Sequence, residues 1–194
     1  MIRKFDKNET LIVVALEKEL PKSLVQEWNV CYTGVGKVNA LISIAQGIST
    51  YEPKTLINYG TAGATDTNIS GLQEVTLFKQ RDMDARALGF ELGETPFDPI
   101  SSIQLNRPGL SCGTGDNFVT EGQVMTVDLV DMEAYAIAKY CLVNRINFYC
   151  YKYVSDHADL DSANQWNNQE WLEQMFFKGA NLFIQNVLDE NPIG

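Results

Sequence analysis

The stretch NVCYTGVGKVNALISIAQGIST, residues 29–50, decides the fold class, because a strand-like run passes through two glycines directly into a helix-like run. Residues 29–35 are rich in residue types that favour strands, and residues 37–50 follow a helical pattern. The link GVGK is too short for a phosphate-binding P-loop and lacks a three-glycine dinucleotide fingerprint. It indicates either a tight strand-to-helix turn or a close approach of the backbone to a ligand.

The same alternation continues along the chain. Further strand-like runs occupy residues 11–16, 55–60, 74–80, 109–113 and 147–154, and further helix-like segments occupy 132–144 and 169–187. This order predicts an α/β fold with a largely parallel or mixed central sheet flanked by helices, forming a single domain over residues 1–194. Residues 89–108 hold three prolines and are predicted to be a long loop.

Composition narrows the class of function. The chain of 194 residues is 45% hydrophobic and carries a formal charge of −10. An acidic chain does not match nucleic acid or an anionic membrane surface, so we expect a small-molecule partner. The short apolar run near the N-terminus shows no export signal. Four scattered cysteines and the single His157 predict no metal, no disulfide framework and a reducing cytoplasm.

Ligands of open α/β sheets bind beyond the carboxyl ends of the strands, so the residues there are candidates for a site. Glu17 and Glu19 follow the first run and would equally suit the first turn of a helix. Phe118 and Met132 suit a core as well as a ligand contact. His157 is interpreted as a surface histidine, since nothing else in the chain suggests a catalytic triad.

Two further acids lie in apolar sequence and need an ion-pair or hydrogen-bond partner if they are buried. At helical spacing, Glu133 shares a face with Ala136, Ile137 and Tyr140, so a carboxylate points toward the core. A buried carboxylate is costly unless it is paired, and the partner is either a structural cation or a ligand hydroxyl. Asp156 follows a strongly apolar strand and is either a helix N-cap or an acid held in a crevice.

Seven segments in order resemble the purine nucleoside phosphorylase and nucleosidase superfamily, most closely its bacterial methylthioadenosine/S-adenosylhomocysteine nucleosidases. They are ALEKEL (15–20), TGVGKVNA (33–40), INYGTAGA (57–64), RDMDARALGFELGE (81–94), GTGDNFV (113–119), VDMEAYAIA (130–138) and VSDHAD (154–159). The resemblance implies a nucleoside phosphorylase-like fold and cleavage of the N-glycosidic bond of adenine-type nucleosides by water. It implies no metal and no organic cofactor, and it implies a homodimer.

The resemblance also implies roles for three acids. Glu19 corresponds to the acid that activates the attacking water, Asp156 to the acid that assists departure of the purine, and Glu133 to the carboxylate on the ribose hydroxyls. These types suit the chemistry, because positive charge develops on the sugar and negative charge on the base. The implied substrate-binding set is Val35, Thr61, Phe118, Val119, Met132, Glu133 and Trp166.

The chain departs from the family pattern in ways that leave two other functions open. It is shorter than typical relatives, around residues 96–108 and 119–128, and Lys152 stands where an arginine is common. A phosphate-dependent phosphorylase would need cations for the phosphate, and no arginine cluster lies near the first strand or the Gly34 turn. A non-catalytic nucleoside-binding protein on the same fold is the third hypothesis.

Overall fold

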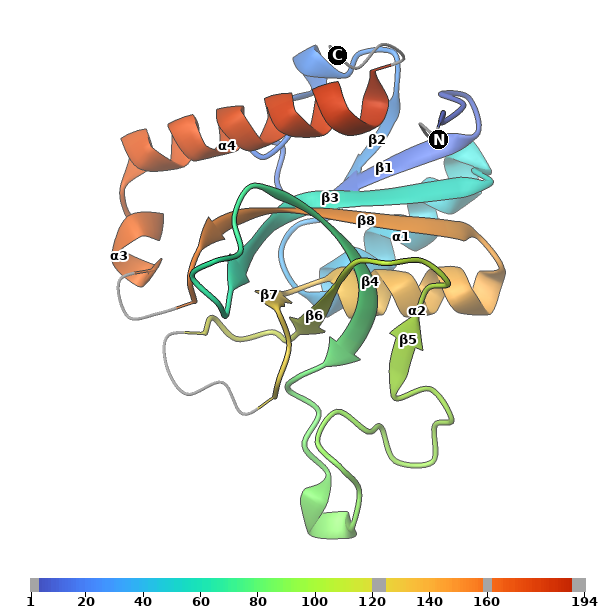
Figure 1. Cartoon of the computed structure of the whole chain (residues 1–194). Helices are drawn as coiled ribbons and strands as arrows, with labels where there is room; N and C mark the ends of the chain where they lie inside the picture. Colours follow the sequence, from blue (N-terminus) through green and yellow to red (C-terminus); the bar gives the residue numbers. More distant parts are fainter. Residues whose placement is uncertain (1–3, 120–124, 159–161, 190–194) are drawn as a thin grey trace.

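A computed structural model of the chain describes residues 4–119, 125–158 and 162–189. Its strands are β1 (Thr10–Val14), β2 (Asn29–Tyr32), β3 (Thr55–Ala64), β4 (Leu72–Gln80), β5 (Ser102–Gln104), β6 (Leu110–Thr114), β7 (Leu129–Asp131) and β8 (Asn147–Asp156). Its helices are α1 (Lys37–Tyr51), α2 (Ala134–Asn144), α3 (Ser162–Trp166) and α4 (Gln169–Phe183), with short turns η1 (Lys22–Leu24), η2 (Arg86–Leu88) and η3 (Ile184–Leu188). The predicted mixed α/β architecture is confirmed (Figure 1).

The sheet combines a parallel part with a closed part. Strands β2, β1, β3 and β8 lie side by side in parallel, so their carboxyl ends meet at one edge. Strand β8 also pairs with β4, β4 with β6, β6 with β7, and β7 returns to the end of β3. These pairings form a closed ring of five strands, and the ring brings the ends of β6 and β7 to the end of β3.

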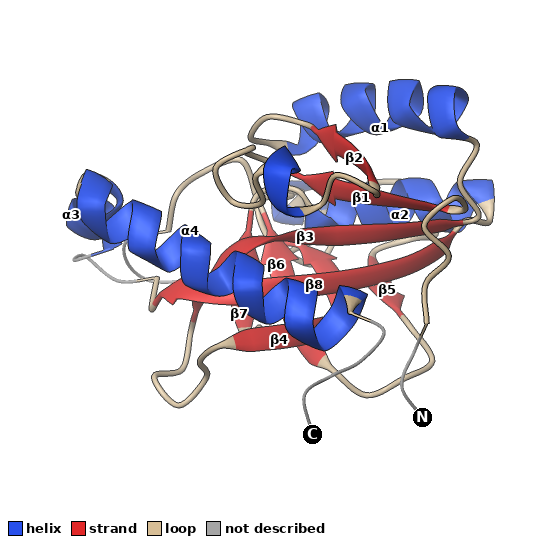
Figure 2. Cartoon of the chain, turned by 90° about the horizontal axis from the view of Figure 1, so that it is seen from above, coloured by secondary structure: helices blue, strands red, loops and turns tan. Residues whose placement is uncertain are grey.

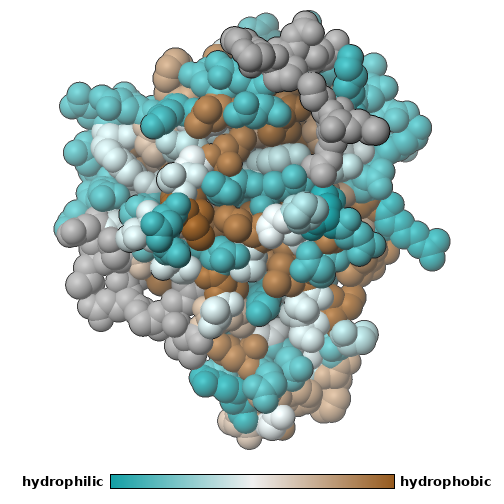
Figure 3. All heavy atoms as spheres, in the orientation of Figure 1, coloured by the Kyte–Doolittle hydropathy of each residue, from teal (hydrophilic) through white to brown (hydrophobic). Residues whose placement is uncertain are grey.

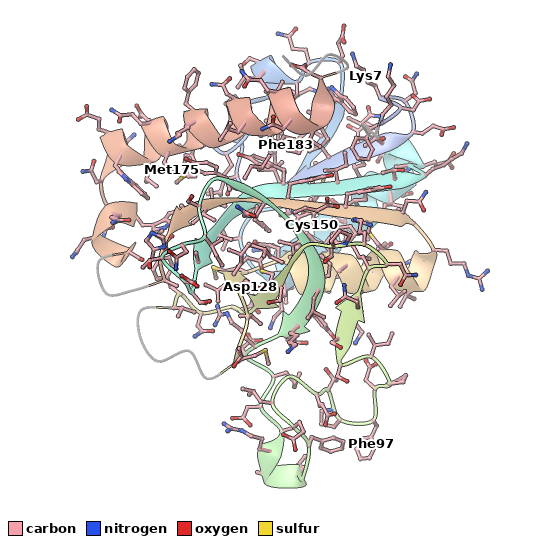
Figure 4. The ribbon with its side chains drawn as sticks, viewed as in Figure 1. Lys7, Phe97, Asp128, Cys150, Met175 and Phe183 are labelled. Carbon is pink, nitrogen blue, oxygen red and sulfur yellow. The ribbon has the colours of Figure 1, made fainter. Side chains whose placement is uncertain are left out.

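Helices cover both faces of the sheet (Figure 2). Alternate residues of β1 point in opposite directions, as strand geometry requires, so Leu11 and Val13 pack toward α1 and α2 while Ile12 and Val14 pack toward α4. Met175 and Phe183 extend from α4 to the sheet (Figure 4). The alternation of the β1 side chains therefore builds one apolar layer on each face.

Two short strands were missing from the sequence prediction. Residues 89–108 are not one continuous loop, because β5 lies within them and pairs with β4 in the antiparallel direction. Strand β7 was also unpredicted, and each of these strands has only three residues. The remainder of the segment between β4 and β5 projects from the body at the bottom of Figure 1, and Phe97 lies on this projection, 95% exposed (Figure 4).

One face of the molecule is rich in hydrophilic residues (Figure 3). Hydrophilic residues are spread over much of the face shown in Figure 3. In the described ranges, none of the helices has both the length and the apolar character needed to cross a bilayer.

Candidate active site

One pocket of about 270 Å³ opens at the carboxyl ends of the strands. This volume is close to the lower end of the roughly 300–1,000 Å³ typical of small-molecule sites, so a nucleoside-sized ligand suits it. All the predicted site residues line it, namely Glu19, Val35, Thr61, Phe118, Val119, Met132, Glu133, Asp156 and Trp166. Of the motif residues quoted above, Asp159 lies outside the described residues.

Glu19 is buried beside the end of β3. Its Oε1 atom accepts hydrogen bonds from the Thr61 main-chain N–H at 2.8 Å and from the Thr61 hydroxyl at 2.7 Å. Its Oε2 atom accepts the Leu16 N–H at 3.0 Å. Glu17 is exposed and lies outside the pocket lining, and no α-helix follows β1 directly, so the first-turn interpretation of this pair is wrong. The carboxylate of Glu19 is therefore held in one orientation, facing the cavity.

The position of Glu133 differs from the sequence prediction. The helical pattern placed it on the apolar face of a helix, but α2 begins at Ala134 and Glu133 is the residue before it, with a non-helical backbone (φ −135°). Its side chain is 7% exposed, and its Oε1 atom accepts the Gly36 N–H at 2.8 Å. Burial raises the pKa of Glu133 to about 7, and the negative charge of Asp131 adds to the rise.

The Gly34–Lys37 link is the tight strand-to-helix turn, and it also reaches the site. Gly36 has φ 95°, a conformation that favours glycine, and its N–H donates to Glu133. The next N–H, of Lys37, donates to Asp116 Oδ1 at 2.8 Å. The start of α1 is thus tied both to Glu133 and to the loop after β6.

Lys152 forms its ion pair with Asp131 and not with Glu133. Its Nζ atom lies 2.8 Å from Asp131 Oδ2, and both side chains are almost fully buried. Asp131 also accepts the Thr114 hydroxyl and the Ala134 N–H. Burial is the largest effect and lowers the pKa of Lys152, but Asp131, with smaller contributions from Cys150, Glu133 and Cys112, raises that pKa overall. The hydrogen bond to Glu133 comes from the Gly36 N–H, while the Lys152 ammonium pairs with Asp131.

Asp156 is an acid held in the crevice, since β8 extends to it and the next helix, α3, begins only at Ser162. The pairing of β3 with β8 shifts by one residue here, because Ala62 pairs with Val154 and Gly63 with Asp156. Such a bulge re-aims side chains, and it directs Asp156 to the pocket. Its carboxylate accepts three hydrogen bonds: from Ser155 Oγ at 2.7 Å, Ala158 N at 2.9 Å and Trp166 Nε1 at 3.0 Å.

Phe118 is not a core residue, because its side chain is 45% exposed and lines the pocket. Its ring meets Trp166 edge to face at 6.3 Å. The loop that carries it is fixed by Arg81, which donates to the carbonyl oxygens of Gly113, Gly115 and Asn117 and to Asn117 Oδ1. An aromatic face held in this way suits stacking on a flat heterocycle.

Four residues that line the pocket were not among the predicted site residues: Asn58, Arg81, Asp131 and Lys152. The signal for Arg81 was its place directly after β4. The neighbouring Asp82 binds Lys37 Nζ at 2.6 Å and lies outside the pocket lining. His157 is exposed, as interpreted from the sequence. Among the described residues, no group of three or more His, Cys, Asp or Glu side chains could hold a metal ion.

No family model matches the chain. It is 34% identical over 160 residues to the 5′-methylthioadenosine/S-adenosylhomocysteine nucleosidase of Staphylococcus carnosus, covering 69% of this chain and 70% of that protein. The nucleosidase of the same name from Haemophilus ducreyi is 29% identical, covering 78% of this chain and 76% of that protein.

Two solved structures share the fold. The structure of the nucleosidase of the same name from Neisseria meningitidis, in complex with methylthio-immucillin-A, matches with a TM-score of 0.74 at 22% identity. That match covers 90% of this chain and 96% of the other. The futalosine hydrolase of Helicobacter pylori matches with a TM-score of 0.78 at 17% identity, covering 90% and 94%.

The fold of the sheet and the 34% identity to the Staphylococcus carnosus protein together place the chain in the nucleoside phosphorylase and nucleosidase superfamily. Within this superfamily, the 34% identity to the Staphylococcus carnosus nucleosidase identifies the family. The chain belongs to the 5′-methylthioadenosine/S-adenosylhomocysteine nucleosidase family.

Proposed function

We propose that this protein hydrolyses the N-glycosidic bond of adenine-type nucleosides with a 5′ substituent, such as 5′-methylthioadenosine or S-adenosylhomocysteine, and releases the free base. The observation that carries the proposal is the convergence of Glu19, Glu133 and Asp156 on one pocket, each buried and each hydrogen-bonded. Family membership supports the same activity.

The three acids would divide the work by their positions. Glu133 would accept the ribose hydroxyls and stabilise positive charge on the sugar. Glu19, held by Thr61 and Leu16, would orient the attacking water. Asp156 would give a proton to the departing purine, which stacks on Phe118, while Val119 contacts the base edge. Met132 and Val35 would pack on the sugar, and Trp166 would line the space for the 5′ substituent.

The direct test is release of free base by the purified protein in phosphate-free buffer, with 5′-methylthioadenosine, S-adenosylhomocysteine and 5′-deoxyadenosine as substrates. We expect adenine in the chromatogram and a loss of at least about 10²-fold in kcat for Asp156→Asn, because acid–base catalysis contributes roughly 10²–10⁴-fold. Intact nucleoside recovered from the wild-type protein across the panel would refute the proposal. If calorimetry then showed tight binding, the non-catalytic binding protein would be the correct hypothesis.

Hydrolysis is favoured over phosphorolysis because the cationic side chains that line the pocket already bind protein groups. Among the described lining residues the cations are Arg81 and Lys152, and both are engaged with protein groups. Neither is free to hold a phosphate dianion against the ribose. We expect no stimulation by phosphate; formation of a sugar 1-phosphate would instead identify a phosphorylase.

The proposal extends to a homodimer in the cytoplasm. Support for the dimer comes from exposed apolar residues on α1, where Val38 is 66% exposed and Ile42 56%. Support for a reducing compartment comes from the four cysteines, all of which are free thiols.

A further inference from the structure

The indole of Trp166 contacts the proposed proton donor directly. Its Nε1 atom donates to Asp156 Oδ2 at 3.0 Å. An indole N–H can donate but cannot accept, so this bond always stabilises a lone pair on the aspartate. Trp166 is therefore more than an apolar wall of the pocket.

The three donors divide unequally between the two carboxylate oxygens. Among the described residues, Oδ2 is contacted by both Ser155 Oγ and Trp166 Nε1, whereas Oδ1 accepts from Ala158 N alone. Each carboxylate oxygen offers about two lone-pair sites, so within the described part of the chain Oδ2 has a partner at both sites and Oδ1 at one. The Ser155 hydroxyl can also donate to the Ala62 carbonyl oxygen at 3.3 Å, whereas the indole N–H can only donate to Oδ2. Oδ1 also lies toward Gly63, a residue of the pocket lining, where a Cβ atom added to the glycine would come within 2.9 Å of it.

Trp166 is held for this contact from both sides. Its ring packs edge to face on the buried Phe176 of α4 at 6.0 Å and on Phe118 at 6.3 Å. The anchored ring fixes the direction of the N–H, and α4 thereby supports the geometry of the acid.

We propose that Trp166 is a positioning residue that selects Oδ1 of Asp156 as the oxygen that carries the proton to the purine. The inference rests on the proposed hydrolase function. The C1′–N bond breaks and its electron pair goes to the purine, while the proton on Oδ1 goes to a purine nitrogen. Water supplies the hydroxyl at C1′ and releases one proton, which restores the protonated acid for the next cycle. Because the indole N–H can only donate, it disfavours a proton on Oδ2 and leaves Oδ1 to carry it.

The first experiment measures the hydrogen bond itself. In a spectrum of ¹⁵N-labelled indole groups, Trp166→Phe and Trp171→Phe identify two of the three tryptophan signals. We expect Asp156→Ala to shift the Trp166 signal and to leave the Trp171 signal in place. A Trp166 signal that does not move would overturn the proposal, whether or not the protein is active.

The second experiment is a double-mutant cycle of Trp166→Phe with Asp156→Ala. Phenylalanine keeps an aromatic ring and loses the N–H, and alanine removes the acceptor. We expect Trp166→Phe to lower kcat about 10-fold with KM changed less than about threefold, as expected for loss of one hydrogen bond to a charged group. Trp171→Phe is the control and should behave as wild type. In the Asp156→Ala background, which has no acceptor for the indole N–H, the Trp166 substitution should have no further effect on kcat/KM or on the Kd of adenine.

Additive losses in the cycle would mean that Trp166 acts by packing alone, which would overturn the inference. Failure of the proposed function has a different signature, because the wild-type protein would then release no base. If the wild-type protein released no base, the shift of the indole signal and the Kd of adenine in the four proteins of the cycle would still test the role of Trp166.

Discussion

At the residue scale, burial changes the acidity of Glu133 in the site. Its carboxylate lies between the Gly36 N–H, which stabilises charge, and the charge of Asp131, which opposes it. Burial is the largest effect and brings its pKa to about 7 from an ordinary 4.5. A substrate that donates two hydroxyls and develops positive charge would stabilise the ionised carboxylate and offset the cost of burying it.

This environment predicts the pH dependence of the reaction. Below about pH 7 Glu133 is protonated in the free enzyme and cannot stabilise the cationic sugar, so kcat/KM should rise as pH increases through about 7. The measurement is a pH profile for wild type and Glu133→Gln, whose activity should be much lower and should lack this limb. A wild-type profile that is flat between pH 5 and 8 would contradict the role of Glu133.

The same residue should make stability depend on pH. The folded-state pKa is raised from 4.5 to about 7, so the contribution of Glu133 is fully present below pH 4.5 and is lost as pH rises through about 7. Thermal unfolding should therefore show Glu133→Gln gaining stability relative to wild type between pH 5 and pH 8, by at most about 3 kcal/mol. An equal difference at both pH values would contradict this assignment.

The buried pair of Lys152 and Asp131 predicts a large loss of stability when it is broken. Lys152→Met leaves a buried carboxylate unpaired and should cost about 3–5 kcal/mol of the free energy of unfolding. Denaturant unfolding measures the loss. Lys152→Arg, which keeps the charge, is the matched control and should cost less; equal losses would mean that volume, and not charge, governs this position.

Glu133 and Asp156 could be singled out from the sequence because each puts a carboxylate among apolar residues, whereas Glu19 was singled out through the resemblance to a family. Their partners could not be singled out, since Gly36 and Glu133 are 97 residues apart and their contact exists only in the folded sheet. Arg81 escaped notice for the same reason, because its hydrogen bonds reach Asn117, 36 residues away. Sequence spacing can therefore indicate which buried polar groups need a hydrogen-bond partner. It cannot indicate which residue the fold places next to them.

At the scale of elements, helical periodicity predicted α1, α2 and α4, and only their ends were uncertain. Glu133 was assigned to the helix because the 3.6-residue pattern cannot distinguish the first helical residue from the one before it. Strands β5 and β7 have three residues each, too few for an alternating pattern to be recognised. Their pairing depends on neighbours in the sheet and not on their own sequence.

The bulge between β3 and β8 provides a prediction at this scale. A methyl group on Gly63 would lie 2.9 Å from Asp156 Oδ1 and 3.1 Å from the Ala158 Cβ atom, so Gly63→Ala should displace the acid. We expect kcat to fall by about 10²-fold, since a misplacement of about 1 Å can have that effect. The control is Gly60→Ala on the same strand, where the nearest atom would be Glu19 Oε1 at 3.4 Å, an ordinary contact. Equal kcat values for the two variants would contradict the proposed position of Asp156.

At the scale of the whole molecule, the parallel order of β1, β3 and β8 brings Glu19 and Asp156 together, and the ring through β4, β6 and β7 adds Glu133 to them. Short connections and right-handed crossovers made the parallel part predictable from the strand–helix alternation. The ring was not predictable, because its closure depends on the short strand β7 and on the antiparallel pairing of β4 with β8.

The exposed face of α1 leads to the prediction on assembly. Val38, Leu41 and Ile42 are exposed at helical spacing, and Leu41 lines a groove that continues to Val143 of α2. A row of apolar side chains left in water is typical of an interaction surface. Because α1 begins at the Gly36 turn, a second copy bound on this face would lie beside the pocket.

Light scattering should therefore give about twice the 21.7 kDa mass of the chain for the wild-type protein. Ile42→Glu should shift the mass to that of one chain, because a charge on this face cannot be buried without a partner. It should also raise KM, since the start of α1 supports Glu133. Lys178→Glu, an exposed substitution on α4 across the sheet, is the control and should remain dimeric. A wild-type mass of one chain with full activity would show that each pocket is complete without a second copy.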